Sequence, residues 1–121
     1  MNVLIVDDEP KLAGLLKSRF EMQGHQALAT ENGDEAVELS RQHPLQLILM
    51  DLSVKGRLSD KALLAELKKV SPQVPVVVIT GNLEAEEPDF QQLGAAALLR
   101  KPIDLSGLDE IVKRVCGSAA A

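Results

Sequence analysis

Three short stretches of uninterrupted apolar residues constrain the fold of this chain more than any other feature of its sequence. They are residues 3–6, 47–50 and 76–79. A strand with one solvent-exposed face alternates apolar and polar residues, whereas a parallel strand covered on both faces is apolar throughout. The three stretches therefore predict the central strands of a parallel sheet with helices on both faces.

The segments between these strands have the residue spacing of amphipathic helices. Residues 26–30 and 96–99 are weaker strand candidates that complete five strand–helix pairs. Right-handed crossovers between the strands then predict a doubly wound α/β fold of (βα)5 type, with its functional crevice at the carboxyl ends of the strands. Apolar residues at steps of three or four predict the buried helix faces: Leu12, Leu15, Leu16 and Phe20; Leu63, Leu64 and Leu67; Leu105, Leu108, Val112 and Val115.

Local signals predict where several helices begin and end. Pro10 suits the first turn of the first helix and Gly24 its end. Asn32 followed by Glu35 predicts a capping box at the start of the second helix. Pro88 is tolerated only in the first turn of the fourth helix, so we expect that helix to be short.

Size and composition exclude several classes of protein. The 121 residues allow one domain, and we expect residues 1–116 to fold and residues 117–121 to form a disordered tail or linker. The single cysteine, Cys116, excludes an internal disulfide. We expect no signal peptide and no membrane span, and therefore a cytoplasmic location. The net charge of −5 and the 2% aromatic content argue against direct binding to nucleic acid.

Charged and polar residues follow the predicted strands at their carboxyl ends. Asp7 and Asp8 follow the first strand, Asp51 the third, Thr80 the fourth and Lys101 the fifth. Two carboxylates 4 Å apart repel by roughly 4 kcal/mol at an effective dielectric constant near 20, so three ionised acids require cations. Lys101 supplies one cation. Carboxylate oxygens favour Mg²⁺ as another, because zinc would prefer histidine or cysteine ligands.

Each of these residues alone has an ordinary explanation, because Asp and Thr commonly cap strands and form turns. Together, three acids, a hydroxyl and an ammonium at one sheet edge are the groups that phosphoryl transfer requires. One acid would be the nucleophile, the others would hold a metal ion, and the hydroxyl and ammonium would bind phosphoryl oxygens. A small phosphatase is a poor interpretation, because Ser53 stands where such enzymes place a second acid.

Four segments have an order and spacing that is specific in combination. They read Val-Leu-Ile-Val-Asp-Asp-Glu-Pro from residue 3, Leu-Ile-Leu-Met-Asp-Leu from residue 47, Val-Val-Val-Ile-Thr-Gly from residue 76 and Leu-Leu-Arg-Lys-Pro from residue 98. With them, residues 2–116 resemble the receiver domain of bacterial two-component response regulators. The resemblance implies a flavodoxin-like sheet with strand order 2-1-3-4-5.

The resemblance also implies a role for each acid. Asp51 would be the phosphoacceptor, taking a phosphoryl group from a phosphohistidine on a sensor histidine kinase or a histidine phosphotransfer protein. Asp8 would bind Mg²⁺ directly and Asp7 mainly through water, with Asp51 and the backbone carbonyl of Ser53 as further ligands. Such a domain is a signalling switch that promotes only its own phosphorylation and dephosphorylation, and it is not otherwise an enzyme.

Other positions would control the switch. By the same resemblance Lys101 would pair with the phosphoacceptor and then with the phosphoryl group, and Thr80 would move towards a phosphoryl oxygen. A cis peptide bond is expected before Pro102. Ser53 and Asn82 occupy the positions that tune phosphoryl lifetime in the family, and their small polar side chains predict a lifetime of minutes.

The chain departs from the family pattern where the signal usually leaves the site. Leu98 replaces the aromatic residue three positions before the lysine, Lys55 a proline, Ser59 a nearby glycine, and Ala95 and Ala96 an acidic pair. We therefore expect output through the fourth helix and the loop before it, more than through a side-chain rotation. The partner would bind the face formed by the fourth helix, fifth strand and fifth helix.

Two functions remain open at this point. The first is a phosphorylation-dependent switch, acting as a monomer or weak dimer. The second is a pseudo-receiver that binds a partner without phosphorylation, for which Leu98 and the altered loop after Asp51 leave room. The cognate kinase and the output are not encoded in these motifs.

Overall fold

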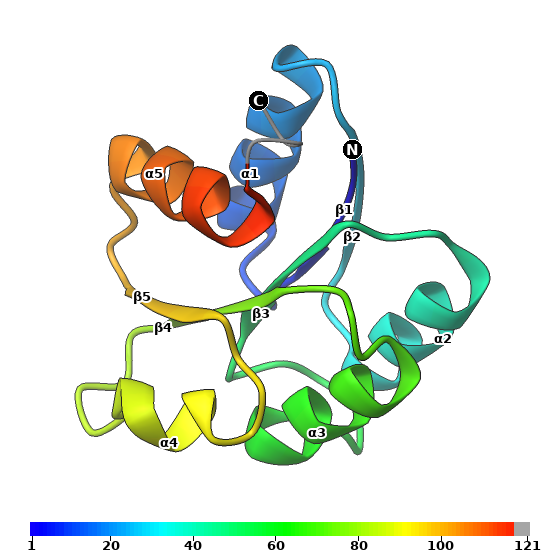
Figure 1. Cartoon of the computed structure of the whole chain (residues 1–121), viewed down its shortest axis with the longest axis vertical. Helices are drawn as coiled ribbons and strands as arrows, with labels where there is room; N and C mark the ends of the chain where they lie inside the picture. The colour runs from blue at the N-terminus through cyan, green and yellow to red at the C-terminus, as the bar shows by residue number, and fades with distance from the viewer. Residues whose placement is uncertain (118–121) are drawn as a thin grey trace.

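Strands and helices alternate along residues 1–117, the part of the chain that the computed structural model describes (Figure 1). The elements are β1 (Asn2–Val6), α1 (Pro10–Met22), β2 (Gln26–Thr30), α2 (Gly33–Gln42), β3 (Leu47–Asp51), α3 (Asp60–Val70), β4 (Val76–Thr80), α4 (Glu87–Gln91), β5 (Ala97–Arg100) and α5 (Leu105–Cys116). The predicted alternation of strand and helix is confirmed. Of the predicted tail, residues 118–121 lie outside the described residues. None of the helices in residues 1–117 has the length and apolar character of a membrane span.

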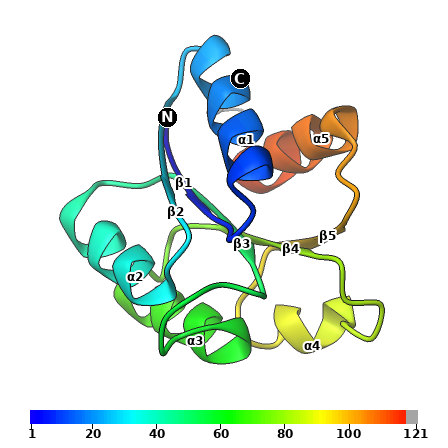
Figure 2. The same ribbon diagram turned by 180° about the vertical axis from the view of Figure 1, so that it is seen from behind.

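All the strands are parallel and lie in the order β2-β1-β3-β4-β5, as expected. Helices α1 and α5 cover one face of the sheet, and α2, α3 and α4 cover the other, as two opposite views show (Figures 1 and 2). In the sheet, β2 lies on one side of β1 and β3 lies on the other, so the direction of the connections reverses at β1. In a doubly wound sheet such a reversal leaves a crevice at the carboxyl ends of the two strands. The crevice of this sheet therefore lies between the ends of β1 and β3.

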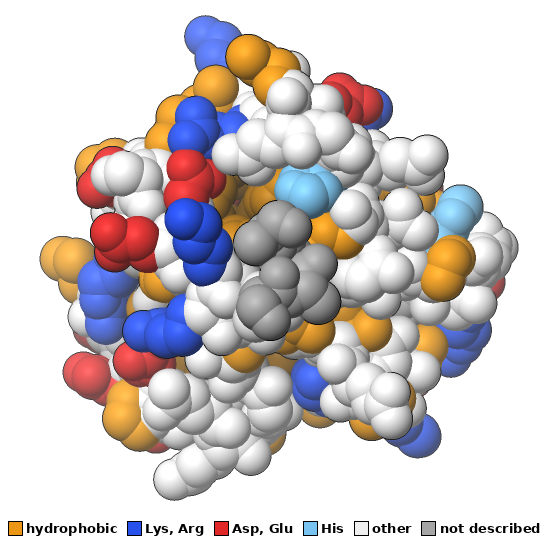
Figure 3. Space-filling view, turned by 45° about the horizontal axis from the view of Figure 1, so that its top comes forward, with side chains coloured by type: hydrophobic (Ala, Val, Ile, Leu, Met, Phe, Trp, Pro, Cys, Tyr) orange, Lys and Arg blue, Asp and Glu red, His pale blue; other side chains and the backbone are white. Residues whose placement is uncertain are grey.

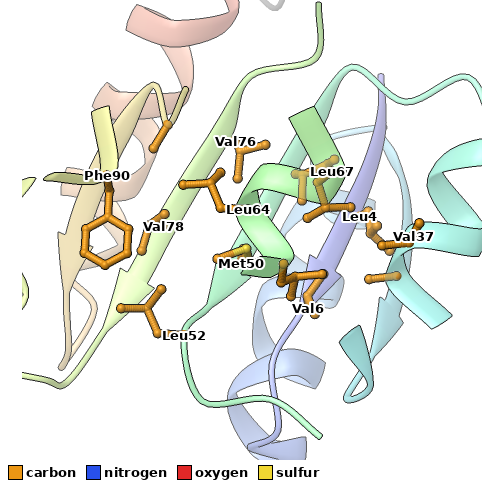
Figure 4. Close-up of a cluster of buried hydrophobic side chains, with 14 of the residues drawn as sticks. Leu4, Val6, Val37, Met50, Leu52, Leu64, Leu67, Val76, Val78 and Phe90 are labelled. Atoms are coloured by element: carbon orange, nitrogen blue, oxygen red, sulfur yellow. The ribbon is translucent and has the colours of Figure 1, made fainter. Parts of the chain in front are cut away.

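The sheet separates two hydrophobic clusters, because successive strand residues point to opposite faces. Leu4 and Val6 of β1 point towards α2, α3 and α4, whereas Val3 and Ile5 point towards α1 and α5. Every residue of β3 and β4 is buried, which confirms that these strands are covered on both faces. Side chains of the first cluster, contributed by strands and helices alike, are shown in Figure 4: Leu4, Val6, Val37, Met50, Leu52, Leu64, Leu67, Val76, Val78 and Phe90.

The predicted buried face of α1 is wrong at one position. Leu16 and Phe20 are buried, but Leu15 is 51% exposed and Ala13 takes the inner position instead. Residues 13, 16 and 20 share one face, and a step of one residue turns a side chain by about 100°, which points Leu15 away from the sheet. The predicted faces of α3 and α5 are confirmed: Leu63, Leu64, Leu67, Leu108 and Val112 are buried, and Leu105 and Val115 are partly buried.

The helix boundaries follow the local signals with one difference. α1 begins at Pro10, and α4 is short, with Pro88 in its first turn. Asn32 Oδ1 accepts a hydrogen bond from Glu35 N at 3.1 Å and so caps α2. The Asn32 N–H donates to Thr30 Oγ1 at 3.1 Å. The expected capping box is therefore modified, since β2 provides the acceptor for Asn32 in place of the Glu35 side chain.

An ion pair joins the two helices on one face of the sheet. Arg19 of α1 donates two hydrogen bonds to the carboxylate of Asp109 of α5. The hydrogen bond from Arg19 holds the pKa of Asp109 below its usual value. Figure 3 shows acidic and basic side chains interleaved on this side of the molecule. The contact reinforces the packing of α1 beside α5.

Candidate functional site

The carboxyl ends of the strands bring the predicted acids and lysine together. Asp51 is the last residue of β3 and Thr80 is the last residue of β4, whereas the sequence predicted that each would directly follow its strand. Lys101 Nζ lies 2.8 Å from Asp51 Oδ2 and 3.6 Å from Asp7 Oδ2. One carboxylate oxygen from each of Asp7, Asp8 and Asp51 lies within 4.8 Å of the others. The site is therefore an acidic cluster with one ammonium against it.

Lys101 is held by three carboxylates, one of which the sequence reasoning missed. Besides Asp51 and Asp7, it contacts Glu9 Oε1 at 3.3 Å. Burial lowers the pKa of Lys101, but the hydrogen bond to Asp51 and the charges of Asp51 and Asp7 outweigh it, and the pKa is raised above its usual value. Lys101 therefore stays charged at neutral pH. The only signal for Glu9 in the sequence is its position directly after the acid pair.

Asp7 is a deeply buried acid of the cluster. Its side chain is almost completely buried, and burial raises its pKa to about 6, with the nearby charge of Asp51 adding to the shift. Asp7 Oδ1 accepts a hydrogen bond from Glu9 N at 2.8 Å. Asp7 Oδ2 is buried and has no hydrogen-bond partner among the described residues. Lys101 Nζ, 3.6 Å away, is too distant for a hydrogen bond to this oxygen, so a cation placed closer to it would offset the cost of its burial.

The two carboxylate oxygens of Asp51 have different partners. Oδ1 accepts a hydrogen bond from the backbone N–H of Ser53 at 3.2 Å, and Oδ2 accepts one from Lys101 Nζ at 2.8 Å. Asp51 itself is 3% exposed. The carboxylate is therefore fixed in orientation at the edge of the crevice, with a loop amide on one side and a cation on the other.

The acidic cluster fits a hard divalent cation. Its donors are carboxylate oxygens from β1 and β3, and a small cation prefers such oxygens and retains water in its remaining positions. Asp7 Oδ2, which has no hydrogen-bond donor, is one oxygen that an ion would satisfy. Histidine and thiolate ligands are not part of the cluster. The donor set is therefore suited to Mg²⁺ more than to zinc.

Thr80 ends β4, and Asn82 lies in the loop between β4 and α4. Thr80 is 2% exposed, and its Oγ1 accepts a hydrogen bond from Asn82 N at 2.9 Å. The Thr80 carbonyl accepts one from Lys101 N at 2.8 Å, which joins the ends of β4 and β5. Asn82 Oδ1 accepts a hydrogen bond from Glu84 N at 2.9 Å. The hydroxyl of Thr80 is thus engaged by its own loop in this structure.

Arg100 fixes the same loop from β5, a role that the sequence reasoning did not find. Its guanidinium donates to the carbonyl of Asn82 at 3.1 Å and to the carbonyl of Ala85. The only signal in the sequence was an arginine directly before Lys101. Because Arg100 and Lys101 are adjacent, one residue of this pair faces the loop while the next faces the acids.

Leu98 lies where the family usually places an aromatic residue. It is partly buried and packs against the cluster that includes α4. Its backbone N–H donates to Glu87 Oε2 at 2.9 Å, so a carboxylate of α4 binds β5 directly. Pro102 follows a cis peptide bond, as expected. Helix α4 is therefore tied to β5 through the backbone of Leu98, and the loop before α4 is tied to β5 through Arg100.

Comparison with known proteins agrees with this fold. The model of the response regulator receiver domain family matches residues 3–113. The polar-differentiation response regulator DivK of Brucella anthropi is 31% identical over 121 residues, which cover 98% of each chain. The nitrogen assimilation regulatory protein NtrX of Azorhizobium caulinodans is 35% identical over 117 residues. The crystal structure of the receiver domain of NtrX from Brucella abortus is 29% identical, with a TM-score of 0.88 and coverage of 96% of this chain and 98% of that one.

A parallel (βα)5 sheet with an acidic crevice at its switch point defines a small α/β domain of the flavodoxin-like class. The chain belongs to the family of response regulator receiver domains of two-component signalling. Members of this family take signals from histidine kinases and act on downstream output domains, so the domain is a signalling module rather than a conventional enzyme. The chain spans about a quarter of the length of the NtrX relative, compared with nearly all of DivK.

Proposed function

We propose that this receiver domain is a phosphorylation-dependent switch whose phosphoacceptor is Asp51. The observation that carries the proposal is the arrangement of the Asp51 carboxylate, with Ser53 N on one oxygen, Lys101 Nζ on the other and two further acids beside it. A carboxylate oxygen of Asp51 attacks the phosphorus of a phosphohistidine. The P–N bond breaks, the imidazole leaves with its electron pair and takes up a proton, and an acyl phosphate forms.

The acids would hold Mg²⁺. We propose Asp8 as a direct ligand and Asp7 as a ligand acting mainly through water, together with Asp51 and the Ser53 carbonyl. Asp7 Oδ2, which accepts no hydrogen bond among the described residues, supports a cation in this crevice. A bound Mg²⁺ supplies positive charge that offsets the negative charge of the transferring phosphoryl group.

Lys101 would stay at the site throughout the transfer. Its pairing with Asp51 keeps the ammonium beside the carboxylate that becomes phosphorylated, so it is placed to pair with a phosphoryl oxygen. Glu9 provides a second contact, which holds the lysine over the crevice when Asp51 is no longer anionic. Lys101 therefore offsets charge without a large movement.

Thr80 would report phosphorylation to the loop before α4. In the present structure Thr80 Oγ1 accepts a hydrogen bond from Asn82 N, and Arg100 holds the Asn82 carbonyl. A move of the Thr80 hydroxyl towards a phosphoryl oxygen ends the bond to Asn82 and leaves the loop held by Arg100. Since Leu98 has no phenolic hydroxyl or flat ring, we propose that output uses rearrangement of this loop and α4.

The proposed partners follow from the family. Phosphoryl groups would come from a sensor histidine kinase or a histidine phosphotransfer protein in the cytoplasm, and a downstream protein would bind the α4–β5–α5 face. We propose no direct contact with nucleic acid and a monomer or weak dimer. Ser53 and Asn82 flank the site with small polar side chains, which leaves access for a hydrolytic water and supports a phosphoryl lifetime of minutes.

Intact mass spectrometry tests the proposal directly. The protein is incubated with Mg²⁺ and acetyl phosphate, and the mass of one phosphoryl group should appear on the wild type and not on Asp51→Asn. The labelled protein, once desalted, should lose the group within minutes, and survival overnight contradicts the proposed lifetime. Absence of any mass gain in the wild type favours a binding module that works without phosphorylation. Structures with and without a phosphoryl mimic should differ in α4 and the loop before it.

A further inference from the structure

The loop that follows Asp51 is paired to the beginning of α2. The backbone N–H of Lys55 donates to the carbonyl of Glu31 at 2.9 Å, and the N–H of Gly33 donates to the carbonyl of Lys55 at 2.7 Å. These two bonds form a parallel bridge between Asn32 and Lys55. We call this contact, between residues 31–34 and residues 55–57, the loop junction.

Side chains reinforce the loop junction from the α2 side. Asp34 Oδ2 accepts a hydrogen bond from the backbone N–H of Arg57 at 2.9 Å, and Lys55 Nζ lies 3.3 Å from Glu31 Oε2. The first contact is a charge-assisted bond to a backbone amide, which is stronger than a neutral one. The second is an exposed ion pair, which contributes little to the free energy of folding. Asp34 is therefore the side chain that matters most to the loop junction.

Two glycines make the loop junction sterically possible. A Cβ on Gly33 would lie 1.9 Å from the carbonyl oxygen of Leu58, so no larger residue fits there. Gly56 has a φ of +99°, and a Cβ there would lie 2.8 Å from Asn32 Oδ1 and 2.9 Å from Asp34 Oδ2. At Gly33 the backbone approaches the Leu58 carbonyl, and at Gly56 it approaches the Asn32 and Asp34 side chains, more closely than a Cβ would allow, so both positions require glycine.

The loop junction lies against the acidic crevice. Asp7, which directly follows β1, lines one surface pocket together with Glu31 and Asn32 of the loop junction. The loop also carries Ser53, whose N–H donates to Asp51 Oδ1 at 3.2 Å. The loop junction therefore anchors the chain only two residues after Ser53.

We propose that the loop junction positions the phosphoacceptor site, with Asp34 as its positioning residue. By anchoring residues 55–57, it keeps the Ser53 N–H on Asp51 Oδ1 and keeps the Ser53 carbonyl beside the acids that would bind Mg²⁺. Asp34 touches neither the phosphoryl group nor the metal, and it acts through the loop. Outer contacts of this kind orient the groups that bind a metal and set its affinity. The inference rests on the proposed function, since it concerns the same site.

The test compares Asp34→Ala with a conservative variant and a matched control. Asp34→Asn keeps a carbonyl oxygen that can accept the Arg57 N–H. Glu35→Ala is the matched control, because Glu35 is the other acid in the first turn of α2. Among the described residues, the Glu35 side chain makes no hydrogen bond to the β3–α3 loop. Backbone amide NMR follows hydrogen exchange at Ser53, Lys55 and Arg57 and, separately, a Mg²⁺ titration of the protein.

In Asp34→Ala, hydrogen exchange at the Arg57 and Ser53 amides should be faster than in the wild type. Half-saturation should require about tenfold more Mg²⁺, as is typical when an outer contact of a metal ligand is lost. Asp34→Asn should recover most of both properties, and Glu35→Ala should match the wild type. If Asp34→Ala shows wild-type exchange at Ser53 and wild-type half-saturation, the inference is wrong. If Asp34→Ala does not fold, Gly56→Ala provides the second variant, because it strains the same contact without a change of charge, and the same two outcomes decide.

These measurements separate the inference from the proposed function. A wild type that takes no phosphoryl group from acetyl phosphate contradicts the function of Asp51, while hydrogen exchange and the Mg²⁺ titration still decide the role of Asp34. A wild type that is phosphorylated, together with an Asp34→Ala variant that is unchanged in exchange and Mg²⁺ binding, contradicts only the loop junction.

Discussion

Arg100 donates a hydrogen bond to the backbone carbonyl of Asn82 at 3.1 Å, and this bond joins the end of β5 to the loop that follows Thr80. The same loop is held from the other side, since Asn82 N donates to Thr80 Oγ1 at 2.9 Å. Asn82 is therefore bound by a residue of each neighbouring strand. A change at either contact should alter the loop in a measurable way.

The first prediction concerns Arg100→Ala. The substitution should lower the free energy of unfolding by roughly 1 kcal/mol, because two loop carbonyls exchange a guanidinium for water. Amide exchange at Glu84 and Ala85 should become faster, and native-state hydrogen exchange by NMR measures it. Arg114→Ala, an exposed arginine of α5, is the control and should leave both values unchanged. Unaltered exchange at Ala85 in Arg100→Ala contradicts the assignment.

The second prediction concerns Lys101→Met. Without Mg²⁺, the variant should lose about 2 kcal/mol of folding free energy at neutral pH, because it leaves Asp51 and Asp7 without their cation. Adding about 10 mM Mg²⁺ should stabilise the variant more than the wild type, since a bound ion replaces part of the missing charge. Urea unfolding with and without Mg²⁺ measures both effects. The prediction fails if the loss is the same in the two conditions.

The third prediction concerns the pH dependence of Asp7. Its pKa in the folded protein is raised to about 6 from an ordinary value of 3.8, with burial as the main cause. The ionised form therefore destabilises the metal-free fold above that pH, and the penalty fades as the pH falls through about 6. Asp7→Asn should have a higher Tm than the wild type at about pH 7.5, and the difference should shrink at about pH 5.

Thermal unfolding in a chelator measures the Asp7 difference, and Asp89→Asn is the control because Asp89 is an exposed acid of α4 that is not part of the acidic cluster. A Tm difference between Asp7→Asn and the wild type that is equal at both pH values contradicts the raised pKa. Loss of stability in Asp7→Asn at the higher pH also contradicts it.

The fourth prediction concerns Glu87→Ala. Glu87 accepts the Leu98 N–H at 2.9 Å, so its removal should accelerate exchange of that amide and weaken the packing of α4 on β5. We expect a loss of about 1 kcal/mol, the usual net value of such a hydrogen bond. Glu86→Ala, the exposed neighbour, is the matched control. Equal protection of the Leu98 amide in both variants refutes the contact.

The sheet could be predicted largely from the sequence because strand burial leaves a direct record in residue type. β1, β3 and β4 are apolar because both of their faces are covered, and this pattern is visible without the structure. The predicted face of α1 was wrong at Leu15, because Leu12, Leu15 and Leu16 fit two overlapping apolar stripes. Ala13 settles which stripe is buried, and a small residue gives little periodic signal.

The acids, Thr80 and Lys101 could be placed at one edge because residues after parallel strands must end on the same side of a sheet. Glu9, Arg100 and Asp34 could not be assigned in the same way. Their contacts depend on side-chain reach and on loop geometry, which periodicity does not encode. Gly33 and Gly56 give no signal of their own for the loop junction, because the pairing between their segments is a tertiary contact.

The bond between Glu87 and the Leu98 amide has a consequence for the edge of the sheet. β5 is an outermost strand, and an outward-facing amide on such a strand is a template for pairing with a strand of another molecule. Glu87 occupies that donor and places a negative charge over it, which discourages intermolecular strand pairing and aggregation. The residue that fastens α4 thus also protects the open edge of the domain, and any movement that displaces α4 exposes that edge for as long as the movement lasts.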